Sequence, residues 1–71
     1  MSINWKLIYT DSDIQRISYL RGLLEENNIA AQVINKIDSV YPSIGSAELY
    51  VDSQFTEQAL NLIKSKDEGQ D

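Results

Sequence analysis

The feature that most restricts the folds open to this chain is an apolar stripe with helical spacing: Ile14, Ile17, Leu20 and Leu24. Residues three or four apart share one side of an α-helix, so the stripe predicts a helix with one buried face. Because the stripe is narrow, this helix should cover one side of a sheet. Segments 3–10 and 29–35 flank it and are rich in apolar and β-branched residues, which predicts a strand on each side.

The second half of the chain adds one more strand and one more helix. The segment AELYV (47–51) alternates, with Leu49 on one side and Tyr50 on the other, and Asp52 or Ser53 can cap the helix that follows. The buried side of that helix is expected to hold Phe55, Ala59, Leu62 and Ile63. If the third strand pairs antiparallel between the first two, the fold is α+β. It has a single-layer three-stranded sheet of order 1-3-2, two helices on one face and the order β-α-β-β-α of a truncated ferredoxin-like fold. A single domain is expected over 1–66, with a disordered polar tail at 67–71.

Three local features refine the first helix. Ser12 and Gln15 fit a capping box at its start. Gly22 inside the helix costs about 1 kcal/mol relative to Ala, so we expect close packing against a neighbour there. Asn28 is placed to end the helix in the left-handed conformation.

Composition excludes several classes of function. The 71 residues contain no Cys and no His, which excludes disulfides and disfavours zinc and haem, so we expect no cofactor or metal. The formal net charge is −5 and the six basic residues form no stripe, which disfavours nucleic acid and anionic membranes as partners. Without His or Cys, and with no phosphate-binding glycine motif, an enzyme is not expected. The apolar runs are short, so a cytoplasmic location is expected.

The sequence of most of the chain resembles a known family. The segments LIYT, RGLLEENNIAAQV and AELYV, followed by an Ala-Leu-rich helix, resemble small bacterial domains of unknown function described as putative prokaryotic signal-transducing proteins. The resemblance covers roughly 5–64. It implies a role in signalling and a fold similar to nitrogen-regulatory PII-type proteins (PII-like), which is an analogy at the level of the fold.

The chain departs from this family's pattern at two places. Asn28 stands where the family usually has Gly, and Asn tolerates the same left-handed geometry. Arg16 and Ile17 stand where the family often has Glu and Ala. Any shared role of that acidic residue is therefore lost here.

Asp11 and Asp13 admit two interpretations. A D-x-D at a strand end suits a divalent cation or phosphate site, while the same residues suit a helix N-terminus. Asp52 would be the third ligand, but its strand runs antiparallel to the first and ends at the opposite edge of the sheet. We therefore favour helix capping.

The face of the sheet that carries no helix is a candidate interface. Gln32, Ile34, Glu48 and Tyr50 should lie on it. From the first strand it receives either Trp5, Leu7 and Tyr9 or Ile3, Lys6 and Ile8. In both cases apolar side chains meet solvent, and a contiguous apolar patch on a sheet more often marks an interface than chance exposure.

The connection from Lys36 to Ser46 carries large apolar residues among turn residues and has two interpretations. We expect at least one of Val40, Tyr41 and Ile44 to fold back as a lid on the core, while the alternative is that Tyr41 and Ile44 contact a partner. The predicted interaction surface comprises Ile34, Lys36, Tyr41, Ile44, Glu48 and Tyr50.

These observations predict a non-enzymatic interaction or signal-transducing module. It would act through the open sheet face and the 36–46 loop, as a homodimer or with a protein partner. The alternative is a sensor of a small metabolite or anion, bound between the loop and the helix start or at a subunit interface.

Overall fold

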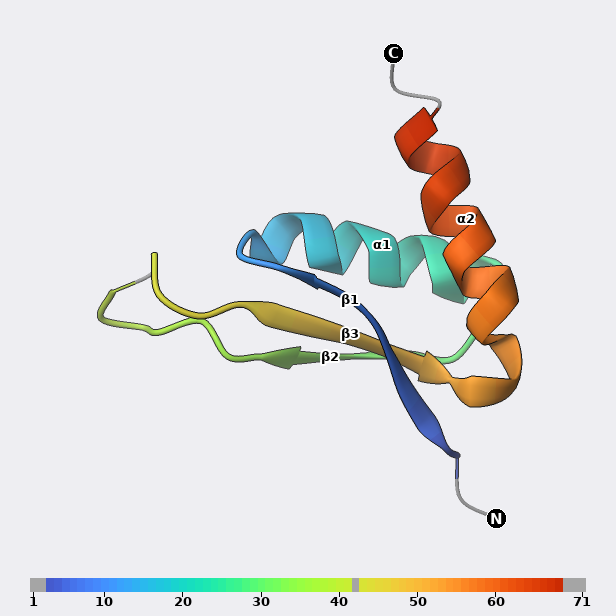
Figure 1. Cartoon of the computed structure of the whole chain (residues 1–71), viewed down its shortest axis with the longest axis horizontal. Helices are drawn as coiled ribbons and strands as arrows, with labels where there is room; N and C mark the ends of the chain where they lie inside the picture. The colour runs from blue at the N-terminus through green and yellow to red at the C-terminus, as the bar shows by residue number, and fades with distance from the viewer. Residues whose placement is uncertain (1–2, 42, 69–71) are drawn as a thin grey trace.

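The computed structural model describes residues 3–41 and 43–68. Its elements, in chain order, are β1 (Trp5–Asp11), α1 (Ile14–Glu26), β2 (Ala31–Asn35), β3 (Ala47–Asp52), the short 3₁₀ helix η1 (Ser53–Phe55) and α2 (Thr56–Glu68) (Figure 1). The predicted order β-α-β-β-α is confirmed. The predicted polar tail overlaps the end of α2, and its remaining residues, 69–71, lie outside the described part of the chain.

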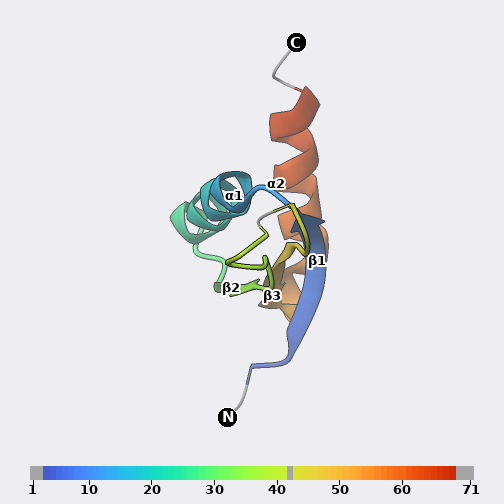
Figure 2. The ribbon, with the colours of Figure 1, turned by 90° about the vertical axis from the view of Figure 1, so that its left-hand side faces the viewer.

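The sheet has the predicted order, with β3 in the centre and antiparallel to both β1 and β2. Both helices lie on the same face of this sheet, α1 along it and α2 rising from its end (Figures 1 and 2). Along β3, Ala47, Leu49 and Val51 are fully buried beneath the helices, whereas Glu48 and Tyr50 on the other side are half-buried. The alternation of AELYV is therefore real, and the fold is α+β.

A single core lies between the helices and the sheet. Its buried residues outside β3 are Ile17, Leu20, Leu24, Ile29, Ala59 and Ile63. The stripe of α1 is thus buried as predicted, with Ile14 half-buried at its start. Phe55 of η1 and Leu62 of α2 are partly buried at the margin, so the predicted side of this second helical segment faces the core.

Strand β1 contains a β-bulge that neither predicted pattern of alternation includes. Leu7 pairs with Tyr50 and Tyr9 pairs with Leu49, which leaves Ile8 as one extra residue. Before the bulge, Trp5 and Leu7 share the open face with Tyr50. After it, Ile8 and Tyr9 both pack against the core. A bulge of this kind re-aims the side chains that follow it.

The prediction that Ser12 caps α1 is wrong, because the N-cap is Asp13. The Asp13 backbone N–H donates to the Asp11 carboxylate at 2.9 Å, and this turn directs the Asp13 carboxylate onto the backbone N–H of Gln15, also at 2.9 Å. At the other end, the left-handed Asn28 is confirmed by a φ of 63°. Asp52 caps η1, which leads into α2, by accepting from the backbone N–H of Gln54 at 3.3 Å.

The predicted close packing at Gly22 is also wrong. Gly22 is exposed, and a Cβ added there would meet no atom within 4 Å. The residue lies away from the buried stripe of α1. Nothing in the packing therefore requires a glycine at this position.

Candidate functional site

The face of the sheet opposite the helices, which we call the open face, carries an apolar surface with polar groups at its centre. Its residues are Trp5, Leu7 and Thr10 from β1, Gln32 and Ile34 from β2, and Glu48 and Tyr50 from β3. Tyr50 lies in the middle, with Leu7 and Gln32 as its cross-strand neighbours. Leu7 is 42% exposed, Trp5 40% and Ile34 38%. Large apolar side chains are thus left in solvent on both edge strands.

Three polar residues form a cluster on this face. The Tyr50 hydroxyl donates to Oε1 of Glu48 at 2.8 Å, and Nζ of Lys36 lies 3.4 Å from the same oxygen. The hydroxyl is the main cause of a lowered pKa at Glu48, and Lys36 lowers it further against the opposing effect of burial. The same hydrogen bond raises the pKa of Tyr50. At neutral pH the carboxylate is therefore charged, and the protonated hydroxyl is directed at it.

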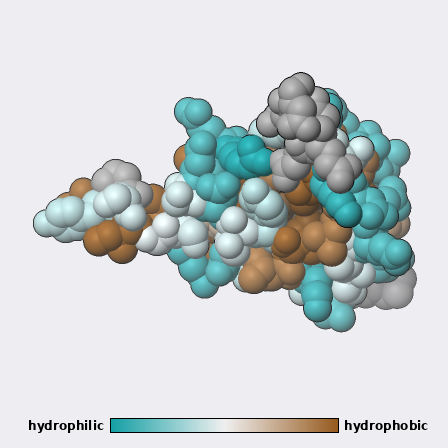
Figure 3. All heavy atoms as spheres, turned by 45° about the horizontal axis from the view of Figure 1, so that its top comes forward, coloured by the Kyte–Doolittle hydropathy of each residue, from teal (hydrophilic) through white to brown (hydrophobic). Residues whose placement is uncertain are grey.

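Residues 36–41 and 43–46, which we call the hairpin arm, extend β2 and β3 beyond the end of the sheet. The backbone N–H of Lys36 donates to Ser46 at 3.0 Å and that of Asp38 donates to Ile44 at 2.9 Å. These bonds continue the register in which Ile34 pairs with Glu48. The arm leaves the body as a narrow projection with hydrophobic atoms on its surface (Figures 1 and 3).

The tip of the arm is held by Asp38. Its carboxylate accepts from the backbone N–H groups of Val40 at 2.7 Å and Tyr41 at 3.0 Å, and these bonds, that of Tyr41 foremost, lower the pKa of Asp38. The Ile44 N–H donates to the Tyr41 carbonyl at 2.8 Å. Local hydrogen bonds therefore hold the described residues of the tip, in spite of their exposure.

The prediction that part of this loop folds back as a lid is wrong. Val40 is 72% exposed, Tyr41 62% and Ile44 57%. Ile37, at the base of the arm, is partly buried against the core. Because the arm continues the line of β2 and β3, its tip is carried past the core rather than over it.

The structure brings four of the six predicted surface residues together. Ile34 pairs with Glu48 across the strands, and Glu48 contacts both Tyr50 and Lys36. The other two, Tyr41 and Ile44, lie farther out on the arm. Trp5 and Leu7 belong to one of the two alternatives predicted for the first strand and not to the six surface residues, because the bulge that decides their side leaves no clear signal in the sequence. Tyr9, the third residue of that alternative, packs against the core instead.

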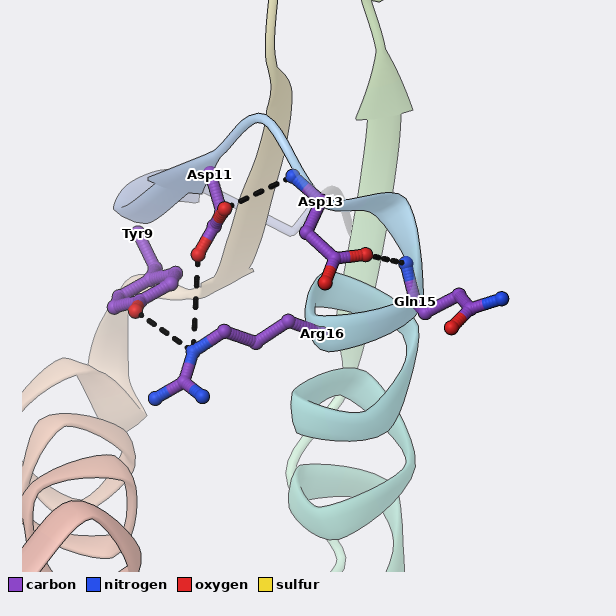
Figure 4. A network of polar contacts seen from close by, with 5 residues as sticks. All are labelled: Tyr9, Asp11, Asp13, Gln15 and Arg16. Carbon is purple, nitrogen blue, oxygen red and sulfur yellow. Dashed lines mark hydrogen bonds and ion pairs between the residues drawn. The ribbon is translucent and has the colours of Figure 1, made fainter.

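Asp11 and Asp13 accept backbone hydrogen bonds at the N-terminus of α1 (Figure 4). The Asp11 carboxylate lies 3.7 Å from Nε of Arg16, which also donates to the Tyr9 hydroxyl at 3.2 Å, and Asp13 is the N-cap. Arg16, at the position where the resembling family often has an acidic residue, thus links α1 to β1. Asp52 pairs with Trp5 at the far end of β1, so it cannot join the other two. Within 3–41 and 43–68, no three His, Cys, Asp or Glu residues are grouped to hold a metal ion.

Comparison with known proteins identifies a family but no individual relative. Neither the curated proteins nor the solved structures include a significant match, so the likeness to PII-type proteins stays a prediction. Over the described residues, neither helix has the length and apolarity needed to cross a membrane. The family described as "putative prokaryotic signal transducing protein", whose name suggests a role in signalling, matches residues 5–66. Since this match spans most of the 71 residues, the chain belongs to that family.

Proposed function

We propose that this domain is a non-enzymatic signalling module that binds a protein through its open face. The observation that carries the proposal is the uncovered sheet surface around Tyr50, where Trp5, Leu7 and Ile34 are each about two-fifths exposed. Apolar side chains that gather on one exposed face of a domain mark a binding site for another protein. Trp and Tyr are the residues that most often dominate the free energy of such contacts.

The polar cluster adds orientation to this apolar surface. Tyr50 donates a hydrogen bond to Glu48, and the ammonium group of Lys36 lies beside the same carboxylate. The Lys36 side chain is 60% exposed. A partner must match a fixed donor and acceptor arrangement as well as an apolar surface. Polar groups placed in this way supply specificity more than affinity.

The absence of enzyme activity is part of the proposal. The carboxylates of Asp11, Asp13 and Glu48 already accept hydrogen bonds from neighbouring groups in the structure, and each of these bonds has a structural role. The small-ligand sensor has weaker support, because the hairpin arm leads away from the start of α1.

Site-specific photo-crosslinking tests the proposal. A benzophenone amino acid replaces Leu7 on the open face or, as the control, Leu60 on α2, since the two leucines are 42% and 44% exposed. Both full-length variants are irradiated as purified protein and in lysate of the source cells. We expect discrete protein adducts from position 7 that position 60 does not give. Equal, diffuse labelling from both positions overturns the proposal.

A further inference from the structure

The outer edge of β1 is not paired with any described strand. The sheet has the order β1-β3-β2, so β1 pairs with β3 on one side only. Figure 2 shows β1 at the outer margin of the molecule, and no described element lies beyond it in this view. A hollow of about 430 Å³ is lined by Leu7, Ile8, Tyr9 and Thr10 and by no described residue of another element. The outward backbone N–H and C=O groups of β1 are therefore open to a further strand.

The β-bulge at Ile8 restricts which strand can pair with this edge. Before the bulge, Lys6 lies on the side of the helices and Leu7 on the open face. After it the alternation is inverted, with Thr10 on the open face and Asp11 on the side of the helices. A regular strand alternates without such a shift, so its side chains match at most one half of β1.

We propose that the edge of β1 pairs with β1 of a second copy of this chain. The two strands run antiparallel about a two-fold axis between Ile8 and Tyr9, so that Leu7 of each copy lies opposite Thr10 of the other. Because the second copy contains the same bulge, every pair joins residues from one side of the sheet. The dimer then has one continuous sheet, with twice the three strands of one copy and with α1 and α2 of both copies on the same face.

This inference goes beyond the proposed function, because it uses the edge of the sheet and not the open face. A two-fold dimer is the commonest form of assembly among soluble proteins, and both copies contribute the same surface to it.

The alternation of β1 selects this register over its neighbours. A shift by one residue places Leu7 opposite Tyr9 or Asp11. A shift by two residues places Leu7 opposite Ile8, or Tyr9 opposite Thr10. In each of these pairs, one residue lies on the open face and the other on the side of the helices. The proposed register is free of such mismatches, which would turn buried side chains toward the wrong face.

Charge also favours a second copy as the partner. Strand β1 (WKLIYTD) contains one basic and one acidic residue, Lys6 and Asp11, so this edge is neutral although the chain has a net charge of −5. In the proposed register Lys6 of each copy lies opposite Asp11 of the other. Opposite charges on facing strands stabilise a sheet, and like charges destabilise it. The Asp11 carboxylate accepts from the Asp13 N–H and lies 3.7 Å from Nε of Arg16, and it has lone pairs for a further donor.

Cysteine crosslinking tests the register, because the chain has no cysteine of its own. Full-length Leu7→Cys and Thr10→Cys are mixed in equal amounts and oxidised mildly, with a tag on one of them. Residues directly opposite each other have Cβ atoms about 4.5–5.5 Å apart, which is close to the separation in a disulfide. We expect the mixture to form tagged–untagged disulfide dimers at least about fivefold faster than either variant alone, because two copies of one variant hold their cysteines about 10 Å apart.

Ile34→Cys is the matched control for Thr10→Cys. Ile34 is 38% exposed on the open face of β2, the other edge strand of the sheet. A mixture of Ile34→Cys with Leu7→Cys should form disulfides no faster than the single variants do. Thermal melts of the reduced proteins verify that each variant is folded.

Charge exchange tests the pairing of Lys6 with Asp11 without any crosslink. Light scattering at high micromolar concentration should show the unmodified chain as a dimer. Lys6→Glu and Asp11→Lys should each dissociate at least about tenfold more readily, because each variant alone places like charges opposite each other twice. Their equimolar mixture should regain the dimer, since the new carboxylate at position 6 faces the new ammonium at position 11. Lys64→Glu, at an exposed position of α2, changes the net charge as Lys6→Glu does and should leave the dimer unchanged.

A second variant at position 11 guards against a loss of folding. Asp11→Lys removes the acceptor of the Asp13 N–H at the start of α1. Asp11→Asn keeps an oxygen that can accept this bond, and it should still weaken the dimer about threefold, because Lys6 of each copy loses its opposite charge.

The outcomes separate this inference from the proposed function. Edge pairing is overturned if Leu7→Cys crosslinks as fast with Ile34→Cys as with Thr10→Cys, or if the charge-exchange mixture forms no more dimer than its components. A monomeric unmodified chain overturns it as well. None of these results decides the proposed function, because the open face stays uncovered in the dimer. Crosslinking of position 7 to another protein in lysate still tests that function, and its adducts differ in mass from those between two copies.

Discussion

The two sides of β3 differ in what their residues contribute. On the helix side, Leu49 and Val51 are completely buried. Glu48 and Tyr50, which alternate with them along β3, lie on the opposite side and form a half-buried polar pair. The two sets share the same strand and the same backbone hydrogen bonds. The helix side of β3 therefore supplies most of the stability of the fold, while its open side leaves polar side chains in reach of solvent.

The largest expected effect comes from removing a core side chain on the helix side. Leu49→Ala should lower the free energy of unfolding by roughly 2–5 kcal/mol, because it leaves a cavity under both helices. Leu7→Ala, its counterpart on the open face, should cost less than about 1 kcal/mol, since Leu7 is already 42% exposed. Urea denaturation in dilute solution measures both. Equal losses would remove the distinction between the two sides.

The hairpin arm should be more sensitive to substitution than its exposure to solvent suggests. Gly45→Ala should destabilise the protein by about 1–3 kcal/mol, because a φ of 92° is strained for Ala and the added methyl group meets the Lys36 carbonyl. The same denaturation experiment applies, with hydrogen exchange of the Asp38 N–H as a local probe. An unchanged protein would show that the arm is not held in the described conformation.

A gain in stability is expected from a substitution on the exposed side of α1. Gly22→Ala should raise the free energy of unfolding by about 0.5–1 kcal/mol, since the position is helical, exposed and has open space beside it. The thermal midpoint should rise correspondingly. A loss instead would mean that a neighbour, such as a second subunit, lies against α1 at this position.

The smallest effect expected is the pH dependence from Glu48. Its pKa in the folded protein lies below the ordinary value of 4.5, so the unfolded chain binds its proton first as the pH falls. The stabilisation by Glu48 is then fully present above pH 4.5 and is lost as the pH falls through the lowered pKa. Asp38 titrates in the same direction, so the diagnostic quantity is the difference from Glu48→Gln. Unfolding curves between pH 3 and 6 should be flatter for that variant.

Much of the fold could be predicted because its signals are local. The spacing of Ile17, Leu20 and Leu24 and the alternation of Leu49 and Tyr50 are properties of single elements, and both are confirmed. The cap of α1 was placed one residue early, since Ser12 and Asp13 are both good capping residues and the Asp11 turn decides between them.

The candidate site was less predictable, because it depends on pairing between distant segments. Glu48 and Tyr50 followed from alternation alone. The side on which Leu7 lies depends on a bulge against β3, some forty residues later in the chain. The direction of the arm likewise depends on how the pairing of β2 with β3 continues past Lys36.

The central position of β3 has a consequence for how this chain is made. β1 and β2 each pair only with β3 in this sheet, although both precede it in the sequence. A growing chain therefore holds two unpaired strands and an amphipathic helix until residues 47–52 have left the ribosome. Contacts between segments far apart in the sequence slow folding, because the intervening chain must first be closed into a loop. Formation of the sheet therefore has to wait for the C-terminal half of the chain.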